Sequence, residues 1–138
     1  MKAIKYFSFL ILPVVAFISF TNKGWLTYTP LIFVFLFVPL LEFLIKPNKK
    51  NFNQEEEKKE KSNKLYTYLL YTVLPIQVTF LFLFFESIRE PNLTTTELSG
   101  RILAMGIICG VMGINVGHEL GHRNNRLDEF IGEILLLT

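Results

Sequence analysis

The sequence is short of the residue types on which several classes of protein depend. Its single cysteine, Cys109, cannot form a disulfide within the chain, which excludes a fold held together by disulfide bonds. Its 14 lysines and arginines are nearly balanced by 12 acidic residues, so there is no basic face of the kind that follows nucleic-acid phosphates. Long segments almost without charge exclude a disordered chain. No nucleic-acid partner is expected.

Apolar residues dominate the chain instead. They make up 51% of it, and the mean hydropathy of +0.39 is too high for an ordinary soluble domain of this length. A helix needs about 20 apolar residues to cross the hydrocarbon core of a membrane. Four apolar segments approach or reach that length, at residues 6–20, 25–45, 65–85 and 102–117, and a fifth begins at Phe130. The sequence therefore predicts an all-α fold: a multi-pass transmembrane helical bundle with four spans and the start of a fifth in the lipid bilayer.

Local patterns predict where the fourth helix begins and how it packs. Thr94 and Glu97 have the spacing of a capping box, so this helix is expected to run from about residue 95 to about residue 123. Asn125 is predicted to cap the helix that follows. Glycines recur along the fourth helix at intervals of three or four and form a smooth strip that lets another helix approach closely, at Gly106, Gly110, Gly113, Gly117 and Gly121.

The distribution of basic residues predicts the orientation of the spans. If the N-terminus is inside the cell, eleven lysines and arginines, Arg123 and Arg126 among them, lie on the inner side. Only Lys23, Arg89 and Arg101 then lie on the outer side. Because inner loops carry the excess of positive charge, we expect a cytoplasmic N-terminus. Residues 46–64 would then form a charged cytoplasmic linker.

The two histidines of the chain, His118 and His122, are the candidate metal ligands. They lie four residues apart at the inner end of the fourth predicted helix, so both imidazoles share one face, one turn apart. Polar groups at membrane depth are costly and mark function, which favours metal binding over a structural hydrogen bond. Asn115 lies on the same stripe and could orient an imidazole as a second-shell residue, or equally bond to a neighbouring helix.

The string His118-Glu119-Leu120-Gly121-His122 fits two kinds of metalloenzyme. In zinc proteases, an H-E-x-x-H pattern supplies two zinc ligands and a glutamate that acts as general base. In membrane oxygenases, an H-x-x-x-H pair belongs to a set of histidine boxes that hold two irons. Imidazole binds either metal, so the ligand type does not decide between them.

The surrounding residues carry a resemblance to one family. Residues 113–137, GINVGHELGHRNNRLDEFIGEILLL, follow a glycine-rich helix and resemble the first histidine box of the integral-membrane alkane 1-monooxygenases of bacteria. That family is related to the membrane fatty acid desaturases and hydroxylases. Its box reads H-E-L-G-H followed by lysine or arginine, which Arg123 matches, and lies at the cytoplasmic end of the fourth of six spans. Intramembrane proteases continue with apolar residues at this point, whereas Arg123 to Arg126 are polar.

The resemblance implies a function for the residues of this box. His118 and His122 would be ligands of a non-haem di-iron centre, and Glu119 would be a second-shell residue of the catalytic site. The protein would hydroxylate the terminal carbon of an alkane with O₂. It would receive electrons from rubredoxin and rubredoxin reductase, and would lie in the bacterial inner (cytoplasmic) membrane. These residues do not distinguish an alkane from an aromatic methyl group or a fatty acyl chain.

The sequence departs from the family because the later histidine boxes and the final spans are absent. Two imidazoles cannot fill the coordination shells of two irons. We therefore expect residues 1–138 to be the N-terminal part of a single membrane-embedded oxygenase domain, and the 138-residue chain alone to be inactive. Two alternatives stay open: an intramembrane zinc metalloprotease, and a small non-catalytic membrane protein.

Overall fold

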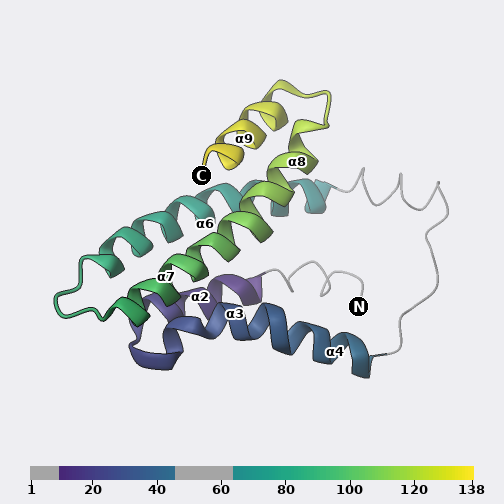
Figure 1. Ribbon diagram of the computed structural model, residues 1–138. Coiled ribbons are helices and arrows are strands. Elements are labelled where there is room, and N and C mark those ends of the chain that lie inside the picture. The colour runs from purple at the N-terminus through teal and green to yellow at the C-terminus, as the bar shows by residue number, and fades with distance from the viewer. Residues whose placement is uncertain (1–9, 46–63) are drawn as a thin grey trace.

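The computed structural model describes residues 10–45 and 64–138, and every regular element in them is helical (Figure 1). This confirms the predicted all-α fold. Residues 46–63 of the predicted linker lie outside the described residues, and Lys64 begins a helix. In chain order the elements are α2 (Ile11–Thr21), the 3₁₀ turn η2 (Gly24–Tyr28), α3 (Thr29–Ile32), the π-helical η3 (Phe33–Phe37), α4 (Val38–Leu44), α6 (Lys64–Ile88), α7 (Thr95–Ile108), the π-helical η4 (Cys109–Ile114), α8 (Asn115–Gly121) and α9 (Arg126–Leu137).

Three helical segments are long and apolar enough to cross a membrane, where the sequence predicts four spans. They are Gly24–Leu44, Tyr66–Ile88 and Thr95–Gly121. The predicted first span, residues 6–20, is described only from Leu10 onward, where α2 forms an apolar helix of 11 residues. The predicted fifth apolar segment, from Phe130 onward, lies within α9, which begins at Arg126. The described residues thus support a multi-pass bundle without confirming the number of spans.

The predicted helix caps are present. The hydroxyl of Thr94 accepts a hydrogen bond from the Glu97 amide at 3.3 Å, and Glu97 Oε2 accepts one from the Thr94 amide at 2.9 Å. This reciprocal pair satisfies two amides that the first turn of a helix leaves free. Asn125 Oδ1 accepts from the Leu127 amide at 3.2 Å and caps α9. Both caps confirm boundaries that the sequence predicts.

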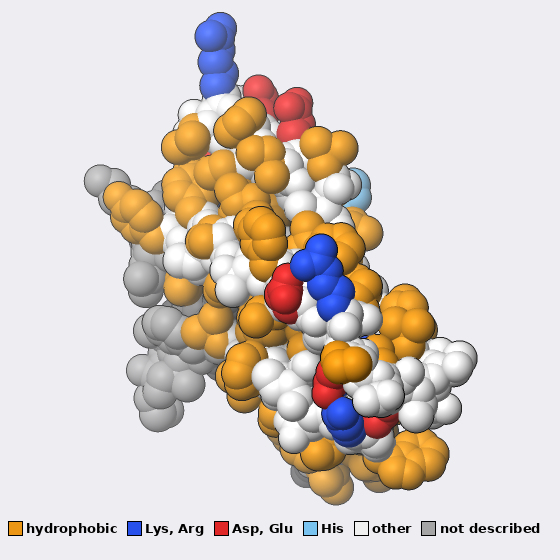
Figure 2. All heavy atoms as spheres, turned by 90° about the vertical axis from the view of Figure 1, so that its left-hand side faces the viewer, with side chains coloured by type: hydrophobic (Ala, Val, Ile, Leu, Met, Phe, Trp, Pro, Cys, Tyr) orange, Lys and Arg blue, Asp and Glu red, His pale blue; other side chains and the backbone are white. Residues whose placement is uncertain are grey.

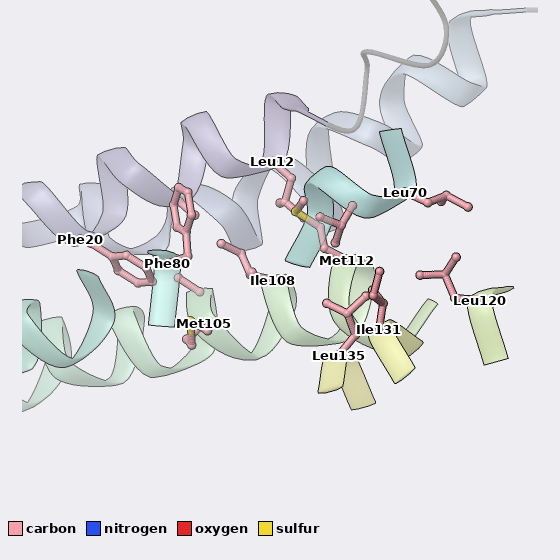
Figure 3. Packing of buried hydrophobic residues seen from close by; sticks show 13 residues of the cluster. Leu12, Phe20, Leu70, Phe80, Met105, Ile108, Met112, Leu120, Ile131 and Leu135 are labelled. Atoms are coloured by element: carbon pink, nitrogen blue, oxygen red, sulfur yellow. The ribbon is translucent and has the colours of Figure 1, made fainter. Parts of the chain in front are cut away.

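The core lies between α2, α6, the α7–η4–α8 rod and α9 (Figure 3). Ala16, Ala104, Ile108 and Leu120 are fully shielded from solvent within it. The second span differs, because no residue of η3 or α4 is buried. Phe33 and Val34 of η3 still pack against the core, whereas the exposed apolar side chains of α4 are suited to contact with lipid. In Figure 1, α4 diverges from α7 and α8 with distance from the turn where the second span begins.

The glycine strip packs against α9 over part of its length only. A Cβ at Gly117 would lie 3.1 Å from the Gly132 carbonyl oxygen, and one at Gly132 would lie 2.9 Å from the Gly117 carbonyl oxygen. A Cβ at Gly113 would lie 3.3 Å from the Leu135 carbonyl oxygen, which also belongs to α9. These contacts let α9 fold back along η4 and α8. A Cβ added at Gly106, Gly110 or Gly121 would have no neighbour within 4 Å, although the Gly121 amide nitrogen lies 3.1 Å from the Cβ position of Gly132. The strip therefore does not contact α9 at Gly106 or Gly110.

A polar network closes the end of the bundle that carries residues 22–28 and 89–94, here named the turn end. Arg101 is buried there, and its guanidinium donates to the carbonyls of Ser87 and Asn22 and to Glu90 Oε2, the last at 2.9 Å. Glu90 also pairs with Lys23 at 2.7 Å. Seen from the turn end, charged side chains form small groups on a largely hydrophobic surface (Figure 2). The turn after α2 and the turn after α6 are therefore joined through one arginine.

Candidate metal centre

The two histidines lie at the opposite end of the bundle, here named the histidine end and comprising residues 115–128. His118 belongs to the last turn of α8, and His122 is its C-terminal cap residue. The His122 amide donates to the His118 carbonyl at 3.2 Å, so one closed helical turn joins the two residues. Both side chains are exposed. The structure thus brings the predicted ligands together on one helical face.

The histidine face of α8 is the face that no described element covers. Gly117 and Leu120 are buried where α9 approaches through Gly132. Arg123 turns toward α6 and donates to Thr67 Oγ1 at 3.0 Å. Successive residues of an α-helix are about 100° apart, so His118 and His122 point away from both neighbours. A ligand or a further protein segment can reach both imidazoles from this side.

Asn115 shares the exposed face with the histidines but bonds within its own helix. Its side-chain amide donates to the Val111 carbonyl, one turn earlier, at 3.2 Å. No described hydrogen bond joins Asn115 to an imidazole or to a neighbouring helix. Its role in orienting a ligand imidazole therefore stays a prediction.

Glu119 is half-buried and its carboxylate is directed to Arg123. The distance between Glu119 Oε1 and Arg123 Nη2 is 3.4 Å. An open pocket of about 340 Å³ lies beside this pair and is lined by Glu119, His122, Arg123 and Asn124. A protease base has to be free to take a proton from a metal-bound water, whereas this carboxylate is engaged by a guanidinium. The arrangement fits a residue that supports the site better than it fits a general base.

The donor set fits one part of a histidine-rich centre. Both imidazoles are exposed and adjacent, and imidazole binds iron as well as zinc. Within residues 10–45 and 64–138, no group of three or more His, Cys, Asp or Glu side chains is placed to hold a metal ion. Further ligands would have to come from outside these residues.

The sequence interpretation missed a polar cluster directly behind the histidines. Asp128, in the first turn of α9, is buried and accepts a hydrogen bond from the Tyr71 hydroxyl of α6. Arg123 lies between Asp128, Thr67 and Glu119. The spacing of four between Thr67 and Tyr71, which puts two polar side chains on one face of an apolar span, is the signal that could have revealed it.

Comparison with known proteins agrees with the resemblance seen in the sequence. No family model matches the chain. It is 23% identical over 126 residues to alkane 1-monooxygenase 1 of Alcanivorax borkumensis, covering 90% of this chain and 31% of that protein. It is 25% identical over 117 residues to alkane 1-monooxygenase of Pseudomonas putida, covering 83% of this chain and 29% of that protein. Alkane 1-monooxygenase 2 of A. borkumensis is 26% identical over 151 aligned positions, which cover 99% of this chain and 38% of that protein. The chain is thus similar, over most of its own length, to about a third of the length of the curated alkane 1-monooxygenases that it matches.

Proposed function

We propose that this chain is the N-terminal part of a membrane non-haem di-iron monooxygenase that hydroxylates the terminal carbon of alkanes with O₂. The observation that carries the proposal is the pair of exposed imidazoles one turn apart, on the uncovered face of the third apolar segment. The similarity to alkane 1-monooxygenases supports the same reaction class. The protein is thus an oxidoreductase of the membrane, acting on an apolar substrate.

Each residue of the exposed face has a role in this proposal. His118 and His122 would hold one iron, with the other ligands supplied by residues outside the described chain, and Asn115 would limit the rotation of an imidazole. Iron, when bound, would supply the oxidising power needed to break an unactivated C–H bond. Glu119 would keep Arg123 in place rather than act as a base.

The apolar surroundings of the histidines suit a substrate dissolved in lipid. Val111 and Ile114 are exposed near Asn115 on the same rod, with 44% and 46% of their surface accessible. Alkyl chains prefer such a surface to water, at about 25 cal/mol per Å² of buried apolar area. An alkane could therefore approach the imidazoles along the rod without leaving the membrane. Alkane is the substrate we infer, in line with the names of the similar proteins.

We further propose the topology and electron supply that the sequence predicts. The histidine end would face the cytoplasm of a bacterium, with the chain in the inner membrane and the N-terminus inside. Hydroxylation places one oxygen atom of O₂ in the alcohol and reduces the other to water. This requires two electrons from outside the chain, together with two protons. Rubredoxin, reduced by rubredoxin reductase, is the soluble donor that we expect at this end.

The test begins with the reading frame that follows codon 138. We expect it to encode further histidine clusters, and expression of the continuous frame with rubredoxin and its reductase to yield 1-alkanols that carry ¹⁸O from ¹⁸O₂. The 138-residue chain alone should yield none. A frame without further histidine clusters, or an alcohol without the label, would contradict the proposal.

Replacement of Glu119 separates the oxygenase from a zinc protease that uses the same motif. Glu119→Gln keeps the shape of the side chain but removes its charge. In the oxygenase, hydroxylation should fall by about 10 to 100-fold, the usual cost of losing a supporting residue, and should stay measurable. In a protease the same change removes the general base and should abolish turnover. Hydroxylation is measured as 1-alkanol formed, and proteolysis as cleavage of a peptide substrate, by matched amounts of each variant.

A further inference from the structure

Two matched stripes of residues run side by side at the histidine end. His118 and His122 form the outward stripe, and the residue that follows each, Glu119 and Arg123, forms an inward stripe. Glu119 lies about 100° around α8 from His118, and Arg123, which follows the C-cap residue His122, donates its amide to the Leu120 carbonyl at 3.0 Å. Whatever fixes the inward stripe therefore also fixes the outward stripe. The contacts that hold the inward stripe therefore determine where the imidazoles point.

Arg123 is the anchor of the inward stripe. Only 19% of its side chain is exposed. Its Nη1 donates to Thr67 Oγ1 at 3.0 Å and lies 3.9 Å from Asp128 Oδ2, while its Nη2 lies 3.4 Å from Glu119 Oε1. The guanidinium carbon is 5.8 Å from the centre of the Tyr66 ring, within the range of a cation–π contact. One side chain thus joins α6, α8 and α9.

The acidic partner of Arg123 is itself fixed. The side chain of Asp128 is 7% exposed and accepts a hydrogen bond from the Tyr71 hydroxyl. A carboxylate buried to this extent is costly without a positive partner, so Asp128 favours the inward position of Arg123. Arg123 is therefore occupied within the chain, unlike Arg126, three residues later, which is exposed.

We propose that Arg123 is a positioning residue for the metal ligands. The helix ends at Gly121 with His122 as its C-cap residue, and terminal turns of helices fray unless another element holds them. The bonds from Arg123 to α6 and α9 hold the turn from 118 to 122 closed and set its rotation, so that both imidazoles face the same open side. This inference rests on the proposed role of His118 and His122 as ligands.

The test uses copper(II) iminodiacetate as a probe of the histidine pair in the 138-residue chain, reconstituted in lipid nanodiscs. This complex has positions left for two imidazoles that lie one helical turn apart. In the wild-type chain, electron paramagnetic resonance should show coupling to two imidazole nitrogens. Arg123→Gln should weaken copper binding by about 10-fold or more and shift the spectrum toward one imidazole. Arg123→Lys, which keeps the charge but cannot bridge two elements, should give an intermediate loss.

Matched variants separate positioning from general destabilisation. Arg126→Gln removes a nearby exposed charge and should leave the copper affinity within 2-fold of wild type. Thr67→Val removes one partner of Arg123 without altering α8, and should weaken binding by about 2 to 5-fold at a temperature where circular dichroism shows unchanged helix content. If Arg123→Gln fails to fold, Thr67→Val and Tyr71→Phe decide the question. Unchanged affinity in these two variants would then overturn the proposal.

The outcomes also distinguish this inference from the proposed function. A wild-type chain that binds copper through one imidazole only would contradict the ligand pair itself, and with it both proposals. A wild-type chain that uses both imidazoles, together with an Arg123→Gln variant of equal affinity and spectrum, would overturn the positioning role alone. The readout requires neither iron nor an electron donor, so it does not depend on hydroxylation.

Discussion

The two ends of the bundle use their polar side chains in opposite ways. At the turn end, Arg101 is fully buried and bonds to Ser87, Asn22 and Glu90, all within the chain. At the histidine end, the two faces of α8 differ. Its inward stripe is anchored by Arg123, while His118 and His122 are exposed and meet no partner among the described residues.

We infer that this difference separates polar groups that stabilise the fold from the proposed metal ligands. Polar groups near a membrane interior are costly unless they are paired, and the turn end pairs its own almost completely. Such a network stabilises the fold, and among the described residues of this network Arg101 Nε is the one buried side-chain nitrogen without a hydrogen-bond partner. His118 and His122 keep their capacity to bind a ligand, because their direction is fixed but they have no partner among the described residues. Substitutions at the two ends should therefore have different consequences, and the following predictions test that.

The largest expected effect is on activity, at the histidine end. In the continuous reading frame, His118→Ala together with His122→Ala should lower hydroxylation by at least about 1,000-fold, equivalent to about 4 kcal/mol of transition-state stabilisation. Stability should change by no more than about 0.5 kcal/mol, since both side chains are exposed. Gas chromatography of 1-alkanols and thermal unfolding in detergent measure the two quantities. Retained hydroxylation would show that the histidines are not ligands.

The converse change is made at the turn end. Arg101→Leu removes three hydrogen bonds of a buried guanidinium and should lower the free energy of unfolding by about 3 kcal/mol. Copper binding by the histidine pair should be unchanged below the melting transition. The control is Lys23→Gln, which removes the other partner of Glu90 from a side chain 56% exposed and should cost less than about 1 kcal/mol. Equal losses of unfolding free energy in the two variants would show that the buried Arg101 and the exposed Lys23 stabilise the turn end to the same extent.

The close crossing of α8 and α9 gives the next largest effect. Gly132→Ala would place a Cβ 2.9 Å from the Gly117 carbonyl oxygen, which is backbone and cannot turn aside. We expect a loss of about 1 to 3 kcal/mol in unfolding free energy, measured by thermal or denaturant unfolding. Gly106→Ala is the matched control, because a Cβ there meets open space and should stabilise the helix by up to about 1 kcal/mol. An equally tolerated Gly132→Ala would mean that α9 does not pack at this distance.

Short-range patterns in the sequence were sufficient to predict much of this structure. The caps at Thr94 and Asn125 depend on residues two or three positions away, and both are present. The paired histidines depend on a spacing of four within one helix, and they share an exposed face. Features that a single helix determines by itself could thus be predicted from the residues alone.

Features that depend on packing between helices could not be predicted in this way. Arg123 and Thr67 are 56 positions apart, and only the fold of α6 against α8 brings them together. The predicted glycine strip was based on one regular α-helix. The π-helical turn at Cys109–Ile114 has more residues per turn, so residues before and after it do not keep the α-helical spacing. Gly113 and Gly117 face α9, while Cβ atoms added at Gly106 and Gly110 would meet no neighbour. The number of spans could not be predicted either, because hydropathy alone does not determine the length of each helix.

The smallest expected effect is a dependence of the turn end on pH. The hydrogen bond from Lys23, followed by that from Arg101, holds the pKa of Glu90 below its ordinary value of 4.5. A carboxyl whose pKa is lower in the folded than in the unfolded chain stabilises the fold fully above the unfolded value. This stabilisation is lost as the pH falls below 4.5 and through the folded pKa. Acid should therefore loosen the turn end.

Comparison with Glu90→Gln isolates this contribution from the other carboxyl groups. The variant cannot titrate at position 90, whereas the remaining acids titrate in both proteins and largely cancel in the difference. At pH 7 the wild type should melt at the higher temperature, and the gap should narrow steadily as the pH falls below 4.5. A gap that stays constant down to pH 3 would show that the Lys23 and Arg101 contacts do not stabilise the charged form of Glu90, and the turn end would then owe its closure to the hydrogen bonds from Arg101 to the two backbone carbonyls.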